Sequence, residues 1–226
     1  GVNNVISGSF MANSSHDLSY NNQVYNYASA LIVAANQSGV SPYHLATRIL
    51  QEQGINGTGN SISGNVSGLT GLYNYYNIGA YKSGNLSAVE VGLKYAAVED
   101  STTLRPWNTR MRALIGGALL VGKAYINGGQ NTIYYEKVDV FSGTYYHQYM
   151  TNLQAALSES AKAATAYTEE FKRDNAITFY IPVFNNMPSA ACSKPTGDGN
   201  PNKYLAGLSV NGISLTPSFN MYNSEY

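Results

Sequence analysis

The chain has 226 residues, which is enough to bury one substantial hydrophobic core and leaves room for a second small module. Thirteen basic and thirteen acidic side chains give zero formal net charge, so there is no electrostatic footprint for nucleic acid or an anionic membrane, and a neutral, polar, carbohydrate-like partner fits better. Cys192 alone cannot form an internal disulfide, His16, His44 and His147 lack metal-ligand spacing, and no apolar run reaches 18 residues, so no metal, cofactor or membrane insertion is expected.

Two consecutive helices are predicted near the N-terminus. Residues 24–38 carry apolar or small side chains at helical spacing and stop at Gly39. The second helix follows at once, with Ser41 expected as its N-cap, Pro42 in its first turn and Gly54 at its end. These boundaries place a glutamate in the last turn of the second helix.

That glutamate, Glu52, is a candidate catalytic acid. Leu45 and Ile49 mark the inward face of the helix, and Glu52 continues this face. The negative end of the helix dipole and partial burial both disfavour a carboxylate, and both therefore raise its pKa. A carboxyl kept protonated near neutral pH is what cleavage of a sugar acetal requires. The alternative is an ordinary helix-terminal glutamate in solvent.

An acid-free interval runs from Gln53 to Val89. Its first part, residues 54–71, is rich in Gly, Ser and Asn and is expected to form a mobile loop or a short hairpin. The second part offers aromatic faces that stack on pyranose rings and amides that bond to hydroxyl and acetamido groups, although a tyrosine-rich core segment is the alternative. The candidate substrate-binding residues in this part are Tyr73, Asn74, Tyr75, Tyr76, Asn77 and Tyr81.

Two more helices are predicted beyond this interval. Ser87 and Glu90 have the spacing of a capping box, so Glu90 is expected to cap a helix rather than to take part in catalysis. A strongly apolar helix begins near Met111 and ends near residues 122–129. Trp107, at the entrance of this helix, is a candidate sugar platform, but a hydrophobic plug is the favoured alternative.

The remaining part of the chain shows three patterns. Residues 132–138 are β-branched and aromatic, which predicts a short strand or an extended segment. Glu136 and Asp139 are expected to be surface or ion-pair residues rather than catalytic partners. Residues 145–171 carry the longest helical pattern, with Leu157 among its inward positions and Tyr149 near its beginning, and residues 177–188 are expected to be extended.

Six short blocks of this sequence, taken together and in order, resemble the bacterial endo-β-N-acetylglucosaminidases of glycoside hydrolase family 73. The resemblance covers roughly residues 20–190. The blocks are SPYHLATRILQEQG (41–54), YYNIGA (75–80), RPWN (105–108), GQNTIY (129–134), HQYMTN (147–152) and IPVFNNMP (181–188).

The resemblance implies a mainly α (α+β), lysozyme-like two-lobed fold with a small loop or hairpin lobe after the catalytic helix. It also implies hydrolysis of β-1,4 glycosidic bonds at N-acetylglucosamine in peptidoglycan, and a secreted protein associated with the bacterial cell wall whose partner is the glycan strand. Glu52 matches the general acid of the family. Tyr149 matches a tyrosine that lines the catalytic cleft, and Gln148 beside it is a further candidate for substrate binding.

The chain departs from the family pattern in one respect. Many members carry a second acid in the lobe after the catalytic helix, and this chain has none from Gln53 to Val89. A retaining enzyme with its own nucleophile needs a second carboxylate about 5 Å away, and an inverting enzyme needs a base at roughly 6.5–9.5 Å. The departure favours attack by the substrate's own 2-acetamido group, positioned by Tyr149, or a water held by Asn and Tyr groups.

Three other functions and a second, smaller module are compatible with the sequence. A lytic transglycosylase or a muramidase on the same fold, or a noncatalytic glycan-binding module of the cell wall, are the alternatives to a glucosaminidase. Residues 1–190 are expected to form the catalytic domain and residues 191–226 a linker and part of a neighbouring β module. The tail from Tyr204 resembles the opening strands of cadherin-like repeats, yet about 25 residues cannot complete a sandwich of roughly seven strands, so it either belongs to a neighbouring module or pairs back on the main domain.

Overall fold

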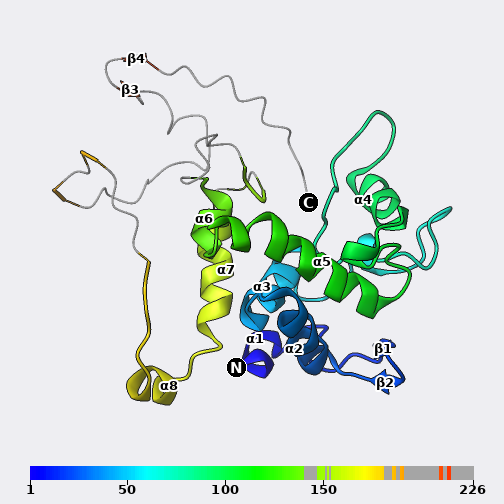
Figure 1. Cartoon of the computed structure of the whole chain (residues 1–226), viewed down its shortest axis with the longest axis horizontal. Helices are drawn as coiled ribbons and strands as arrows, with labels where there is room; N and C mark the ends of the chain where they lie inside the picture. The colour runs from blue at the N-terminus through cyan, green and yellow to red at the C-terminus, as the bar shows by residue number, and fades with distance from the viewer. Residues whose placement is uncertain are drawn as a thin grey trace. The chain divides into compact units, whose positions relative to one another are not determined.

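The computed structural model describes residues 1–139, 147–150, 152, 154–180, 185–186 and 189–190, and the backbone of two short strands beyond them. Contacts divide the chain into two compact units, Gly1–Ile177 and Thr178–Tyr226. The first unit is mainly helical, as expected (Figure 1). Its elements are α1 (Val2–Ile6), β1 (Ser19–Tyr20), β2 (Gln23–Val24), α2 (Tyr27–Ser38), α3 (Pro42–Gln53), η1 (Asn60–Ile62), α4 (Ala88–Ala97), η2 (Ser101–Thr103), α5 (Arg110–Ala124), η3 (Ile126–Gly128), α6 (Ile133–Lys137), α7 (Ala155–Ala164) and α8 (Glu169–Asp174).

Strands are short in both units. In the first unit β1 and β2 pair antiparallel, with Ser19 opposite Val24. In the second unit β3 (Ser209–Val210) pairs antiparallel with β4 (Ile213–Ser214). The expected boundary near residue 190 and the cadherin-like nature of the tail stay predictions.

The helix that the sequence predicts before Gly54, which carries Glu52, is present as α3. Ser41 occupies the N-cap position and Pro42 the first turn, although the Ser41 side chain makes no capping hydrogen bond. The helix ends at Gln53, and Gly54 follows with φ of 69°. This left-handed conformation favours glycine over other residues, so Gly54 fixes the end of the helix just beyond Glu52.

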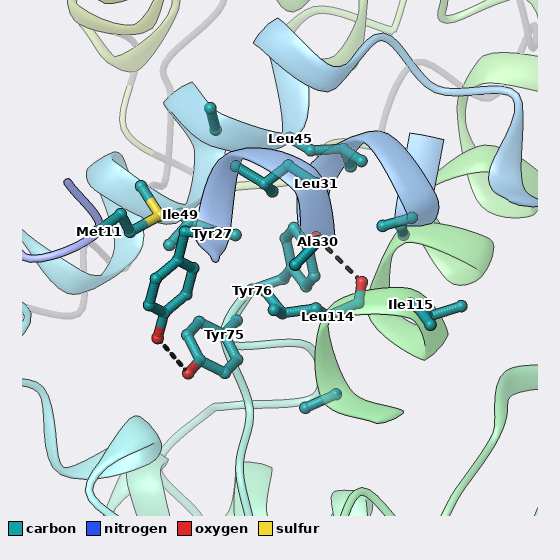
Figure 2. Packing of buried hydrophobic residues seen from close by; sticks show 14 of the residues in the cluster. Met11, Tyr27, Ala30, Leu31, Leu45, Ile49, Tyr75, Tyr76, Leu114 and Ile115 are labelled. Atoms are coloured by element: carbon teal, nitrogen blue, oxygen red, sulfur yellow. Dashed lines mark hydrogen bonds between the residues drawn. The ribbon is translucent and has the colours of Figure 1, made fainter. Parts of the chain in front are cut away.

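The hydrophobic core forms where α2 packs against α5 and α3 (Figure 2). Leu31, Leu45, Ile49 and Leu114 are fully buried in it. Two glycines on α5 allow the closest approaches. A Cβ on Gly116 would overlap the Thr103 carbonyl oxygen, and a Cβ on Gly117 would overlap the Tyr76 ring. No larger residue fits at these positions. Helix α5 therefore fixes the position of residues 73–81, the tyrosine segment, beside α3.

The capping box at the start of α4 is confirmed. The Ser87 backbone N–H donates to Glu90 Oε2 at 2.8 Å, and the Ser87 hydroxyl accepts from the Glu90 backbone N–H at 3.3 Å. The structure also confirms the favoured prediction for Trp107, that it is a hydrophobic plug. It is fully buried, and its Nε1–H donates to the Thr103 carbonyl at 2.8 Å, so it is a plug in the core.

One local prediction is confirmed in part and another is wrong. Of the loop or hairpin expected at residues 54–71, the structure shows a loop that contains η1, whose Ser61 and Ile62 are buried. Residues 132–138 form no strand, because α6 runs from Ile133 to Lys137. The Thr132 hydroxyl accepts a hydrogen bond from the Tyr135 N–H at 3.0 Å and starts this helix, which overrides the β propensity of the segment.

The long helix expected over residues 145–171 is also incorrect where the structure describes it. Helix α7 covers Ala155–Ala164, and a separate α8 starts after Thr168, whose hydroxyl accepts from the Phe171 N–H. Leu157, expected to face inward, is 75% exposed, while Ala155 and Glu159 form the buried side of α7. Residues 177–180 form neither helix nor strand, and 181–184 and 187–188 lie outside the described residues.

No helix in the described part of the chain is both long and apolar enough to cross a membrane.

Candidate active site

Glu52 lies half-buried in the last turn of α3, on the face that the sequence predicted. Asn77 donates from Nδ2 to Glu52 Oε2 at 3.0 Å and to the Glu52 carbonyl at 3.3 Å. Burial raises the pKa of the Glu52 carboxyl above its ordinary value, and this effect exceeds the opposing effect of the Asn77 hydrogen bond. Glu52 is therefore more readily protonated than a solvent-exposed glutamate, as a general acid must be.

Gln53 holds the tyrosine segment against the end of α3. Its Nε2 donates to the Tyr75 carbonyl at 2.9 Å and to Asn77 Oδ1 at 3.3 Å, and its Oε1 accepts from the Ser61 hydroxyl at 3.0 Å. Asn77 itself has a left-handed backbone, with φ of 49°. These contacts bring the Asn77 amide to the Glu52 carboxyl.

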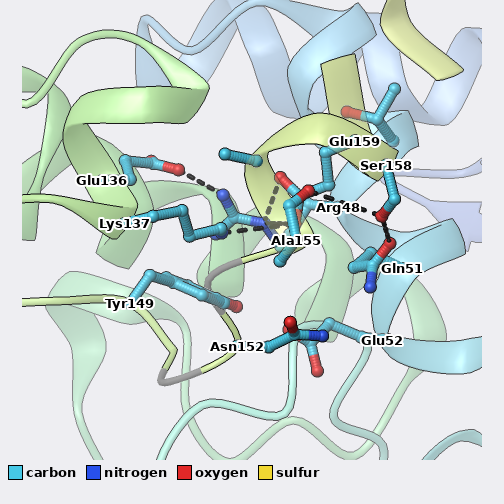
Figure 3. A network of polar contacts seen from close by, with 12 residues as sticks. Arg48, Gln51, Glu52, Glu136, Lys137, Tyr149, Asn152, Ala155, Ser158 and Glu159 are labelled. Atoms are coloured by element: carbon cyan, nitrogen blue, oxygen red, sulfur yellow. Dashed lines mark hydrogen bonds and ion pairs between the residues drawn. The ribbon is translucent and has the colours of Figure 1, made fainter. Parts of the chain in front are cut away.

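Tyr149, which Figure 3 shows together with Glu52, is near enough for the Glu52 charge to act on its hydroxyl. Its hydroxyl donates to the Tyr76 carbonyl at 2.5 Å, and its backbone N–H donates to the Glu136 carbonyl at 2.9 Å. Burial, together with the negative charge of Glu52, raises the pKa of the Tyr149 hydroxyl well above its ordinary value. The residue is therefore a neutral phenol within electrostatic reach of Glu52.

A buried ion network lies next to the Tyr149 ring, and Figure 3 shows part of it. Arg48 Nε donates to both carboxylate oxygens of Glu159, at 3.0 and 3.2 Å, and Lys137 Nζ lies 3.2 Å from Glu159 Oε1. Arg48 Nη2 contacts Glu136 Oε2, and His44 Nε2 lies 3.0 Å from the same oxygen. The network consists of His44, Arg48, Glu136, Lys137 and Glu159.

Glu136 and Glu159 are each neutralised within this network. Burial alone would raise the pKa of Glu136, but His44 and Arg48 lower it below its ordinary value. The ion-pair interpretation of Glu136 is confirmed, whereas a surface position is wrong for both Glu136 and Asp139, which are buried. No local pattern predicts Arg48, Lys137 or Glu159 as site residues, because fully buried charges are rare and their partners come from other helices.

Four predicted substrate-binding residues have no exposed side chain to offer a sugar. Asn74, Tyr75, Tyr76 and Trp107 are all fully buried. The Tyr75 and Tyr76 hydroxyls bond to Tyr27 and to the Leu114 carbonyl respectively (Figure 2). Asn74 bonds through Nδ2 to the Ile78 and Gly92 carbonyls. Their assignment to direct sugar contact is corrected to a structural role in holding the segment that carries Asn77.

The other four predicted binding residues keep accessible surface, although half-buried Asn77 uses its amide to bond Glu52. Tyr81 is 63% exposed, and Gln148 is exposed next to Tyr149. Tyr73 is half-buried, with the Arg110 guanidinium carbon 4.5 Å from its ring centroid. Their contact with substrate stays a prediction.

No cluster of three or more potential metal ligands occurs among the residues that the structure describes.

The sequence of this chain is similar to those of known bacterial proteins. Over 148 residues, 62% of this chain, it is 34% identical to a β-N-acetylglucosaminidase of Bacillus subtilis, and over 154 residues, 64% of this chain, it is 30% identical to a bifunctional autolysin of Staphylococcus aureus. The chain is a homologue of bacterial glucosaminidases and autolysins. This confirms the resemblance that the sequence blocks indicated. The chain spans 15% and 11% of the length of these two relatives, and no family model matches it.

Solved structures support the fold. Autolysin E of S. aureus, as a catalytic mutant in complex with the disaccharide NAG-NAM, aligns with a TM-score of 0.54 and 19% identity, covering 76% of this chain and 66% of that one. Unmutated autolysin E aligns with the same TM-score and 20% identity, covering 76% of this chain and 65% of that one. The fold of this chain is therefore the mainly α, lysozyme-like fold of the autolysin glucosaminidases.

Proposed function

We propose that this chain is a glycoside hydrolase that cleaves β-1,4 bonds at N-acetylglucosamine in peptidoglycan glycan strands. One observation carries the proposal: Glu52, with its pKa raised by burial, accepts a hydrogen bond from the Asn77 amide and is near enough to Tyr149 for its charge to act on the Tyr149 hydroxyl. The relatives are named as glucosaminidases and autolysins, which supports a cell-wall glycan as substrate and a secreted, wall-associated protein.

Glu52 is the general acid in this proposal. Its carboxyl donates a proton to the glycosidic oxygen as the bond to the anomeric carbon breaks, and positive charge develops on the departing sugar. The Glu52 carboxylate that results is stabilised by the Asn77 hydrogen bond and by the positive charges of Arg48 and Lys137. A single residue thus has an environment that suits both of its protonation states.

Substrate assistance replaces the second carboxylate. Glu159, which has an electrostatic effect on Glu52, is fully buried and paired with Arg48 and Lys137, so it is not available as a base or nucleophile. Glu136 is occupied in the same way by Arg48 and His44. The carbonyl oxygen of the substrate's 2-acetamido group attacks the anomeric carbon instead. Water then opens the cyclic intermediate, and the Glu52 carboxylate accepts the proton of that water.

Tyr149 orients the acetamido group. The Tyr149 hydroxyl donates its hydrogen bond to the Tyr76 carbonyl, so only the lone pairs of the hydroxyl oxygen remain to bind a ligand. Such an oxygen accepts a hydrogen bond from the acetamido N–H, and this contact aligns the carbonyl oxygen with the anomeric carbon. The contact also stabilises positive charge as it develops on the acetamido nitrogen.

The substitution Glu52→Gln tests the proposal, because it keeps the shape of the side chain and removes the titratable proton. We expect the rate of clearing of a purified cell-wall suspension to fall by about two to three orders of magnitude or more. Glu99→Gln is the matched control, since Glu99 is an exposed glutamate outside the site. A folded Glu52→Gln protein that clears the suspension near the parent rate would show that the assignment is wrong.

A further inference from the structure

The buried ion network meets the proposed site at one residue, Arg48. Arg48 lies on α3 one turn before Glu52 and has no exposed surface. Its guanidinium reaches Glu136 on α6 and Glu159 on α7, and so ties three helices together. It therefore shares a helix with the proposed acid and reaches the segment that carries Tyr149.

The Arg48 guanidinium also covers the Tyr149 ring. Its central carbon lies 3.7 Å from the ring centroid, and Lys137 Nζ lies 4.8 Å from the same centroid. Cation–π contacts of this kind gain strength when they are desolvated. Tyr149 is held by its backbone at Glu136, by its hydroxyl at Tyr76 and by its ring at Arg48.

We propose that Arg48 is a positioning residue that fixes the Tyr149 ring, and thereby places the Tyr149 hydroxyl next to Glu52 for the reacting acetamido group. This inference rests on the proposed function, and it adds a residue that touches no substrate. A planar guanidinium can stack on a ring while it donates in its own plane to two carboxylates. Lysine carries the same charge without this geometry, so the role depends on shape as well as on charge.

Arg48→Lys separates positioning from charge. We expect a folded protein in which kcat is about tenfold lower or more and KM is little changed. In a Tyr149→Phe background the hydroxyl is already absent, so Arg48→Lys is expected to change kcat by less than about twofold. An equal loss of kcat in both backgrounds would overturn the inference, because Arg48 would then act independently of the Tyr149 hydroxyl.

The control reproduces the same contacts elsewhere in the chain. The Arg105 guanidinium carbon lies 4.2 Å from the centroid of the Tyr95 ring, and its Nη2 pairs with Asp100 at 3.0 Å. Arg105→Lys therefore removes an arginine–tyrosine stack and an arginine–carboxylate geometry away from Glu52. Its kcat is expected to stay within about twofold of the parent.

Because Arg48 is buried with its partners, Arg48→Lys can fail to fold. The pair Arg48→Met and Glu159→Gln removes one charge of each sign, so the net charge of the network is kept, with Glu136 still next to His44 and Lys137 still within electrostatic reach of Glu136. We expect the same loss of kcat and the same dependence on the Tyr149 hydroxyl. A near-parent kcat in this double variant would contradict the inference.

A second measurement separates this inference from the proposed function. The ring signal of Tyr149 in a tyrosine-labelled NMR spectrum is assigned by its disappearance in Tyr149→Phe. We expect Arg48→Lys, or the double variant, to shift this signal, whether or not the parent protein cleaves glycan. A parent protein that does not cleave glycan would refute only the proposed function. An unchanged Tyr149 signal in these variants would refute only the positioning role.

Discussion

At the scale of single residues, Asn77 sets the balance between the two protonation states of Glu52. Its amide donates to Glu52 Oε2, and this bond favours the carboxylate and lowers the pKa that burial raises. Gly would accept the left-handed backbone of this position, where φ is 49°, while removing the amide. Asn77→Gly therefore tests the hydrogen bond with the least strain.

For Asn77→Gly we expect the pKa of Glu52 to rise further. A general acid acts in its protonated form, so kcat falls as pH rises through this pKa, and the alkaline limb of the kcat profile moves to higher pH in the variant. The measurement is kcat against pH for parent and variant on the same glycan. A limb that stays in place or moves to lower pH would mean that the Asn77 amide does not act on the catalytic acid.

The sequence predicts single residues well only where local geometry decides their place. Helical spacing from Leu45 and Ile49 predicts the side of α3 on which Glu52 lies, and Glu52 is half-buried there. The prediction that Tyr75 and Tyr76 bind substrate is wrong, because composition does not show which side of a non-helical segment is buried. Their burial depends on Gln53 and Gly117, which come from two different helices.

At the scale of elements, α5 controls the position of the tyrosine segment. A Cβ at Gly117 would overlap the Tyr76 ring, whose carbonyl accepts the Tyr149 hydroxyl. We expect Gly117→Ala to destabilise the fold by about 1–3 kcal/mol, as overpacking of a core does. Gly128→Ala is the control, because a Cβ there would meet nothing within 4 Å.

The measurement for Gly117→Ala is denaturant unfolding of the two variants beside the parent. If Gly117→Ala and Gly128→Ala unfold at the same midpoint as the parent, the close packing of α5 on Tyr76 is not a constraint. At the assay temperature, displacement of Tyr76 is also expected to lower kcat by more than the loss of folded protein accounts for.

Element boundaries followed from the sequence where caps mark them. Pro42 and Gly54 bound α3, and Ser87 with Glu90 starts α4, as predicted. Helix α6 was missed because its side chains favour a strand, whereas the Thr132 cap and the pairing of Glu136 with Arg48 favour a helix. Contacts between residues so far apart in the chain cannot be derived from local patterns.

At the scale of the whole molecule, the proposed site is contained in the first compact unit. Glu52, Asn77, Tyr149 and the ion network all lie within Gly1–Ile177. We therefore expect a chain without residues 200–226 to keep its hydrolytic rate and its cooperative thermal melt. Loss of the cooperative melt on truncation would show that the tail is part of the core.

The ends of the digestion products decide whether this chain hydrolyses glycan at N-acetylglucosamine with Glu52 as its acid. Peptidoglycan digested by the parent protein is reduced with borohydride and analysed by mass spectrometry, with Glu52→Gln as the control digest. We expect reduced N-acetylglucosamine ends that are absent from the control. Reduced muramic acid ends would indicate a muramidase, anhydro ends would indicate a lytic transglycosylase, and either result would show that the proposed function is wrong.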